Sequence, residues 1–411
     1  MDVVYPACAG LDVHQKTIVV CVRLSQPSGA VTKHVRTFGT TTRDLSTLAI
    51  WLQTHGVTHV AMESTGVLWK PVWNVLETET PMTLLLVNPQ HVAKVPGRKT
   101  DVSDAEWLAQ LLQCDLLRGS FIPPRAIREL RDLTRSRTTL EQQRTRVVNR
   151  LHKVLEDANI KLGAVVTDIT GVSGRAILQA LIAGETAPGT LADLARGRLR
   201  HKRARLQEAV TGHVTDHHRF LLRRLMSQLA YLGEEIATFD QRLRETAAPF
   251  EAELARLDTI PGVNRRAAEN LLAEIGAEMH AFPTEGHLVS WAGICPGQYT
   301  SAGRQSHGTI RKGNHWLGRT IVQAAIAAAR KKKSYFQAQF RRLAGRRGKQ
   351  RALIAVAHSL LVAAYFILRD NVEYRDLGSD HFDRLRPEAL TRYFVRRLEQ
   401  LGHTVPLSTA A

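Results

Sequence analysis

Cysteine is scarce and scattered in this sequence. The 411 residues include four cysteines, Cys8, Cys21, Cys114 and Cys295, and no two of them form a CxxC pair. This spacing argues against a disulfide framework and against a zinc site, and it suits a reducing compartment.

Long hydrophobic runs and a secretory signal are also missing. The longest apolar stretches, residues 321–329 and 353–368, are rich in alanine or interrupted by polar residues, so neither predicts a membrane span. The chain begins Met1-Asp2-Val3 and has no basic stretch ahead of an apolar one, which argues against a signal peptide. We therefore expect a cytoplasmic protein.

Acidic residues are too few to balance the basic ones. The chain has 38 Asp and Glu against 56 Lys and Arg, which gives a formal net charge of +18. Such an excess favours a polyanionic partner and, in a bacterial-type cell, association with the nucleoid. A merely basic soluble enzyme remains the alternative. The length predicts two or three domains, and 44% hydrophobic residues are ample for packed cores.

The first part of the chain has a mixed α/β pattern. Strands are predicted at residues 8–13, 17–23, 31–38, 57–62 and 82–87, and helices at 42–54, around 67–76 and from near Asp101. A three-strand meander followed by helix, strand, helix, strand and helix is the order of the ribonuclease H fold. A doubly wound nucleotide-binding fold would begin with a strand-helix crossover instead.

The middle of the chain is predicted to be helical. Residues 125–160 form one long helix with heptad-compatible apolar positions, and a second helical block has a cleaner a/d seam. That seam consists of Leu225, Leu229, Leu232, Ile236, Phe239 and Leu243. It indicates a coiled coil, and both a helical hairpin within one chain and a dimer seam would explain it.

A mainly helical C-terminal domain is predicted to start near Leu257. Ile260-Pro261-Gly262-Val263 followed by a helix over residues 264–275 is typical of a helix-hairpin-helix element, although an ordinary turn explains it equally well. The predicted domains are residues 1–120, 121–256 and 257–380, followed by a tail over residues 381–411.

Four acidic residues lie at the positions where a metal site is predicted. Asp12 ends the first strand, Glu63 ends the fourth, and Asp101 and Asp104 lie three apart at the last helix. In a ribonuclease H fold the first strand lies beside the fourth and the last helix crosses their ends, so the four would converge. Carboxylates that close repel each other without a cation, and hard oxygen ligands select Mg²⁺ or Mn²⁺. Taken singly, each acid also suits a helix cap or a surface position.

These motifs closely resemble a known family. They are Gly10-Leu11-Asp12-Val13-His14, Glu63-Ser64-Thr65-Gly66, Asn88-Pro89, Lys99-Thr100-Asp101 and Asp104-Ala105. They are similar to those of the DEDD-type serine transposases of insertion sequences, over residues 7–380. The resemblance implies a RuvC-like domain, a coiled-coil region and a transposase domain. It also implies a DNA recombinase guided by a structured bridge RNA, acting as a homodimer or tetramer.

A second family signature spans residues 291–304. By this resemblance, Ser301 is the nucleophile that attacks DNA and forms a phosphoserine link. The family more often has glycine directly after this serine, whereas Ala302 follows here, which leaves Ser306 as the lesser candidate. Arg304, Arg311 and Lys312 would stabilise charge on the phosphate. The serine and the carboxylates would form a composite site across subunits.

Basic residues continue beyond this loop. Together with Lys99, the expected nucleic-acid contacts are Lys331, Lys332, Lys333, Arg346 and Arg347. Tyr335, Phe336 and Phe340 are interleaved with them, a pattern that suits phosphate contacts and base stacking. A solvated charged face is the alternative.

Two other functions compete with the recombinase hypothesis. In a nuclease like the Holliday-junction resolvases, metal-bound water would attack the DNA and the C-terminal domain would only bind it. An inactive nucleic-acid-binding transposon remnant is the second, and the intact Asp12, Glu63, Asp101, Asp104 and Ser301 weigh against it. A sugar-kinase or actin-like ATPase lacks support, because no later Gly-rich phosphate loop follows.

Overall fold

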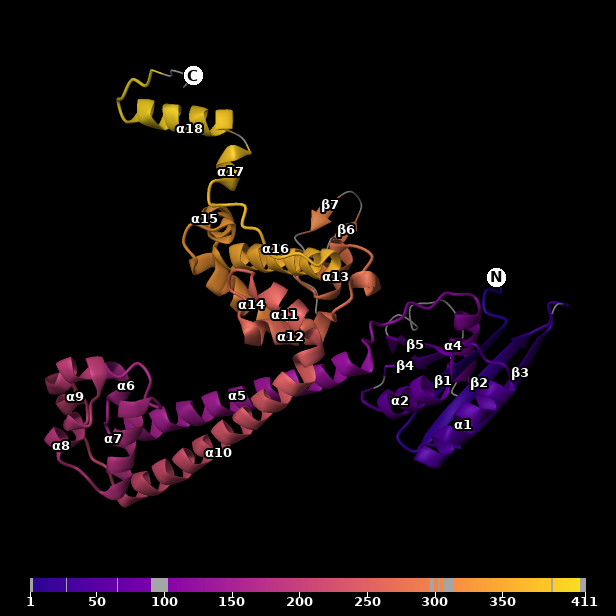
Figure 1. Cartoon of the computed structure of the whole chain (residues 1–411), viewed down its shortest axis with the longest axis horizontal. Helices are drawn as coiled ribbons and strands as arrows, with labels where there is room; N and C mark the ends of the chain where they lie inside the picture. The colour runs from indigo at the N-terminus through magenta and orange to yellow at the C-terminus, as the bar shows by residue number, and fades with distance from the viewer. Residues whose placement is uncertain are drawn as a thin grey trace. The chain divides into compact units, whose positions relative to one another are not determined.

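The computed structural model consists of two compact units, Met1–Ile122 and Pro123–Ala411, here called the N-terminal and C-terminal units (Figure 1). The residues described are 3–26, 28–64, 66–89, 103–295, 299–301, 304–306, 313–385 and 387–406. The finer division into domains at residues 256 and 380 stays a prediction.

A five-stranded mixed sheet forms the centre of the N-terminal unit. Its elements are β1 (Ala7–Val13), β2 (Thr17–Ser25), β3 (Val31–Gly39), α1 (Thr42–Thr54), β4 (His59–Glu63), α2 (Trp69–Glu79), β5 (Thr83–Val87) and α4 (Ser103–Gln113). The strand order is β3-β2-β1-β4-β5, in which β1 to β3 are antiparallel and β4 and β5 run parallel to β1. The strands and helices follow each other along the chain in the predicted order, and the mixed sheet is compatible with a ribonuclease H-like domain.

The side chains of this sheet pack into two separate cores, one on each face. On one face Leu11, Ile18 and Met62 pack against buried residues of α1 and α2. On the other face Cys8 and Ala61 pack against α4. Because successive side chains of a strand point to opposite faces, Gly10 and Asp12 lie on the same face as Cys8. The position of α4 therefore decides what lies near Asp12.

Two long helices dominate the first half of the C-terminal unit. α5 (Arg125–Asp157) and α10 (Asp216–Ala247) pack along each other within the chain, side by side in Figure 1. Five of the six predicted seam residues on α10 are buried, and Phe239 is half-buried. The pairing favours the helical hairpin over the dimer seam, while the coiled-coil geometry stays a prediction.

The hairpin carries a small helical lobe, residues 158–215, here called the tip lobe. It contains α6 (Leu162–Val165), α7 (Val172–Ala183), α8 (Pro188–Asp193), the 3₁₀ helix η1 (Gly197–Lys202) and α9 (Arg203–Ala209). Its core joins Ile177, Leu191 and Leu206 to Leu151 of α5 and Leu225 of α10. The tip lobe is thereby packed onto one end of the helix pair.

The remainder of the C-terminal unit is a helical domain with one small hairpin. Its elements are η2 (Ala248–Phe250), α11 (Glu251–Asp258), α12 (Arg265–Ile275), η3 (Met279–Ala281), α13 (Glu285–Trp291), β6 (Tyr299–Ser301), β7 (Arg304–Ser306), α14 (His315–Arg330), α15 (Tyr335–Arg347) and α16 (Lys349–Asp370). A short turn through Gly262 joins α11 to α12, and its role as a helix-hairpin-helix phosphate site stays a prediction.

α16 is long and apolar enough to cross a membrane, but half of its apolar window is buried within the protein. Leu360, Leu361 and Ala364 are among its fully buried residues. The core helix of a soluble protein has the same composition, so this helix is weak evidence for a span. After it, the expected tail contains two further helices, α17 (His381–Arg384) and α18 (Pro387–Gln400).

Candidate active site

Two of the predicted catalytic acids lie at the ends of neighbouring strands. Asp12 is one residue beyond Leu11, which pairs with Met62 in the parallel register of β1 and β4. Glu63 is likewise one residue beyond Met62 and pairs with Val87 of β5. Residues at matching positions of parallel strands face the same side. Asp12 and Glu63 therefore share the α4 face at the carboxyl end of the two strands.

The third acid, Asp104, lies in the first turn of α4. α4 crosses the sheet at Gly10, so closely that a Cβ atom on this glycine would come within 2.3 Å of the Ala105 carbonyl oxygen. Only glycine permits this approach. Since Gly10 precedes Asp12 by two residues on the same face, the start of α4 lies over the end of β1, and Asp104 comes to that end of the sheet.

The fourth acid, Asp101, and Lys99 lie outside the described residues. Asp12 is half-buried, and its carboxylate lies 3.0 Å from Nε2 of the exposed His14. Among the described residues, no three Asp, Glu, His or Cys side chains form a group that could hold a metal ion. The fold thus brings Asp12, Glu63 and Asp104 to one end of one face without closing them into a ligand cluster.

The predicted nucleophile lies in the small hairpin of the C-terminal unit. β6 and β7 are antiparallel, and the last residue of β6, Ser301, pairs with the first residue of β7, Arg304. Ser306 pairs with Tyr299 at the other end of the ladder. The backbone thus assigns Ser301 to the turn end of the hairpin and Ser306 to its base. Arg311 and Lys312 lie outside the described residues.

Both ends of the loop that contains this hairpin are fixed. The loop follows α13 at Ala292-Gly293 and ends at Gly313, where a Cβ atom would lie 2.3 Å from the Ala292 carbonyl oxygen. The two ends therefore touch through their backbones. Directly after Gly313, the Asn314 side chain caps α14 by accepting hydrogen bonds from the backbone N–H groups of Trp316 (3.0 Å) and Leu317 (3.3 Å).

Glu274, near the end of α12, connects this cap to the long helix α5. Its carboxylate accepts a hydrogen bond of 2.5 Å from the Asn314 amide and two, of 2.7 and 2.8 Å, from the Arg135 guanidinium. Arg131 donates to the backbone carbonyls of Ala273 (2.9 Å) and Glu274 (2.8 Å). Burial lowers the pKa of Arg131, and nearby Glu274 opposes that shift. The end of the loop over residues 292–313, here called the serine loop, is thus tied to α5.

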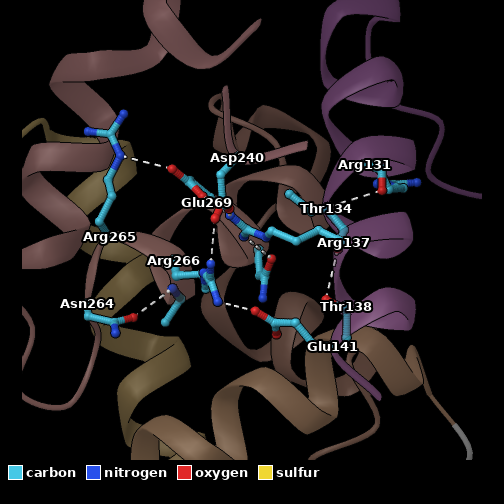
Figure 2. A network of polar contacts seen from close by, with 12 residues as sticks. Arg131, Thr134, Arg137, Thr138, Glu141, Asp240, Asn264, Arg265, Arg266 and Glu269 are labelled. Atoms are coloured by element: carbon cyan, nitrogen blue, oxygen red, sulfur yellow. Dashed lines mark hydrogen bonds and ion pairs between the residues drawn. The ribbon is translucent and has the colours of Figure 1, made fainter. Parts of the chain in front are cut away.

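A second buried ion network fixes α12 one turn earlier (Figure 2). Arg137, only 2% exposed, donates to Glu269 (2.7 Å), Asp240 (3.1 Å) and Asn270 (3.1 Å), so it joins α5, α10 and α12. We did not predict this network from the sequence. The available signal was a gap in the heptad pattern of α5, because Arg137 occupies the seam position between Leu133 and Leu140.

Five of the predicted basic contacts lie on described residues beyond the hairpin. Lys331, Lys332, Lys333, Arg346 and Arg347 are all exposed. The aromatic rings between them are less available than we expected. Phe336 is 1% exposed and stacks on Tyr374, and the ring of Tyr335 stacks on Phe382 at 5.2 Å. Phe340 is half-buried. The exposed basic residues are therefore available for phosphate contacts, whereas the buried ring of Phe336 is not available for base stacking.

Comparisons with known proteins match both units. A family model described as "Transposase", for the DEDD transposases of IS110, matches residues 9–160. A second, described as "Transposase IS116/IS110/IS902 family", matches residues 254–341. A "Probable family 20 transposase" of Pseudomonas aeruginosa is 25% identical over 66% of this chain and 71% of its own length. An "Insertion element IS110 uncharacterized 43.6 kDa protein" of Streptomyces coelicolor is 34% identical over 29% of each chain.

Proposed function

The chain belongs to the IS110 family of insertion-sequence transposases, and from this premise we propose that it cuts and rejoins DNA through a phosphoserine at Ser301. Asp12, Glu63, Asp101 and Asp104 are the acids of this reaction, in a ribonuclease H-like, RuvC-like domain. The observation that carries the proposal is the shared position of Asp12, Glu63 and Asp104 at one end of the α4 face.

The serine accounts for strand exchange without an energy source. Its Oγ loses a proton and forms a bond to phosphorus. The bond from phosphorus to a deoxyribose oxygen breaks, and that oxygen takes up a proton to become a free hydroxyl. A hydroxyl of another strand reverses the step and releases Ser301. The number of phosphoester bonds is conserved. The position of Ser301 at the turn end of β6–β7, opposite Arg304, supports this residue over Ser306.

The acids suit a divalent cation by their chemistry. Asp12, Glu63 and Asp104 offer hard carboxylate oxygens from one face, and Asp101 would complete the set for Mg²⁺ or Mn²⁺. When bound, such a cation stabilises charge on the oxygens of a phosphodiester. Asp12 and Glu63 are held in register by the sheet, while Asp104 depends on the close packing of α4 on Gly10.

DNA is the partner of a transposase, and the positive charge of the chain agrees with it. We assign DNA contacts to Lys99, Arg304, Arg311, Lys312, Lys331, Lys332, Lys333, Arg346 and Arg347. A structured guide RNA would supply sequence choice by base pairing. A homodimer or tetramer would bring the acids of one copy to the serine of another, in a soluble protein that acts on DNA in the cytoplasm.

Trapping of the covalent adduct tests this function. The protein, with any RNA that copurifies, is incubated with Mg²⁺ and DNA containing the ends of its own element, and adducts are separated in denaturing gels. We expect an adduct for the wild type and Ser306→Ala and none for Ser301→Ala. DNA cleavage without an adduct would instead support the hydrolytic nuclease, and an adduct in Ser301→Ala would exclude this serine as the nucleophile.

A further inference from the structure

A dense run of positive charge lies in the tip lobe and includes none of the residues assigned above. It consists of Arg196, Arg198, Arg200, His201, Lys202, Arg203 and Arg205, here called the basic ridge. No acidic residue occurs between Asp193 and Glu208. The whole tip lobe has eight Lys and Arg against four Asp and Glu, so the ridge, which supplies six of the eight, accounts for its excess.

The ridge is part of a folded surface. It spans η1 and the first residues of α9, and all seven of its side chains are exposed. Leu199 is half-buried, and Leu206, which follows the ridge, is 0% exposed in the core of the tip lobe. The backbone N–H of Arg196 donates to Ser173 Oγ at 2.9 Å. Apolar anchors thus hold the backbone while the cations face solvent.

Little of this charge is neutralised within the chain. Arg203 forms a two-pronged ion pair with Asp193, at 2.5 and 3.0 Å. In the described residues, no other member of the ridge has a carboxylate within ion-pair distance. Clustered cations that repel each other without opposing charge are stabilised by a polyanion. Leu199 is half-buried against the core of the tip lobe, so the ridge offers no large exposed apolar side chain for insertion into a membrane.

We infer that the basic ridge binds the phosphate backbone of a nucleic-acid duplex, as a second contact that uses none of the residues assigned to strand exchange. A duplex carries one phosphate charge per about 1.7 Å of its axis, which suits the dense array of exposed cations in the ridge. This contact rests on the nucleic-acid partner of the family and not on the serine chemistry.

Salt-dependent binding of the full-length protein tests the ridge. The variant Arg198→Gln/Lys202→Gln/Arg205→Gln removes three cations and keeps Arg200 and Arg203, which bond within the lobe. The matched control, Arg392→Gln/Arg396→Gln/Arg397→Gln, removes the same charge from the exposed face of α18. Binding to a labelled 30-bp duplex of arbitrary sequence, as DNA and as RNA, is measured by fluorescence anisotropy between 50 and 300 mM salt.

For the ridge variant we expect the slope of log K against log salt to decrease in magnitude by about 2 to 3, since each phosphate contact contributes about 0.9. The control should change it by less than 1. A larger change on DNA than on RNA, or the reverse, identifies which duplex the ridge holds. A ridge variant with unchanged melting temperature that binds both duplexes like the control would overturn the inference. Because binding needs no serine, Ser301→Ala should match the wild type here even if the adduct test fails.

Discussion

Asp12 in the N-terminal unit and Glu274 in the C-terminal unit are both acids with defined positions, yet their surroundings are opposite. Asp12 is half-buried at a strand end, where its ion pair is with His14, which is positive only when protonated. Glu274 is 2% exposed, and its carboxylate is bound by the Arg135 guanidinium and the Asn314 amide. The first acid is accessible to a ligand, and the second is satisfied by the chain itself.

The contrast separates the acids that we propose for the chemistry from acids that hold the fold. A buried carboxylate costs several kcal/mol of desolvation, which good geometry with cations offsets. Glu269 and Glu274 meet this condition through Arg137 and Arg135. The acids at the end of the sheet share a face, but among the described residues no three of them form a group that could hold a metal ion. Substitution should therefore affect activity in one unit and stability in the other.

The largest effect is expected in the N-terminal unit. Asp12→Asn should reduce DNA cleavage on the order of 10³-fold, because it removes the charge of a proposed metal-binding carboxylate while keeping its shape. The melting temperature and DNA affinity should stay near wild type. Glu106→Gln, on the same helix as Asp104 and paired with Lys33, is the matched control and should stay within twofold in activity. Equal losses in the two variants would contradict a specific role for Asp12.

Glu274→Ala should have the reverse effect. It leaves Arg135 and Asn314 without their common acceptor, and breaking a buried ion pair costs about 3–5 kcal/mol. We expect calorimetry to show a lower melting temperature for the C-terminal unit. Glu245→Gln, an exposed acid on α10, serves as the control. If Glu274→Ala melted like Glu245→Gln, the tie between α5 and the serine loop would not stabilise the fold.

The smallest effect should come from the start of α12, the helix that carries both buried glutamates. The Asn264 side chain accepts a hydrogen bond of 3.0 Å from the Ala267 N–H and caps the helix. Asn264→Ala should destabilise the C-terminal unit by about 1 kcal/mol, and Asn264→Ser should restore most of the loss. Denaturant unfolding of the three proteins measures this, and equal stability of all three would show that the cap contributes nothing.

The sequence was most informative where structure is local. Alternating apolar residues and turn residues predicted the strands of the sheet. Their sequence along the chain, a meander followed by helix-strand crossovers, indicated how they are arranged in the sheet. For the same reason, the sequence predicted that Asp12 and Glu63 lie at the ends of their strands. The buried networks were not predicted, because the partners of Arg137, Glu269 and Glu274 come from other helices, and the gap in the heptad pattern at Arg137 does not identify them. The helix α18 in the expected tail was also missed, and its residues Tyr393, Phe394 and Leu398 are exposed.

Mixing two inactive variants tests most directly whether the two units serve one reaction across subunits. Asp12→Asn retains Ser301, and Ser301→Ala retains the four acids, so a mixed oligomer would contain one complete site of the kind we propose. We predict that unfolding and refolding the two proteins together restores adduct formation, with DNA linked only to the Asp12→Asn subunit. A mixture that forms mixed oligomers and stays as inactive as either parent would contradict the account.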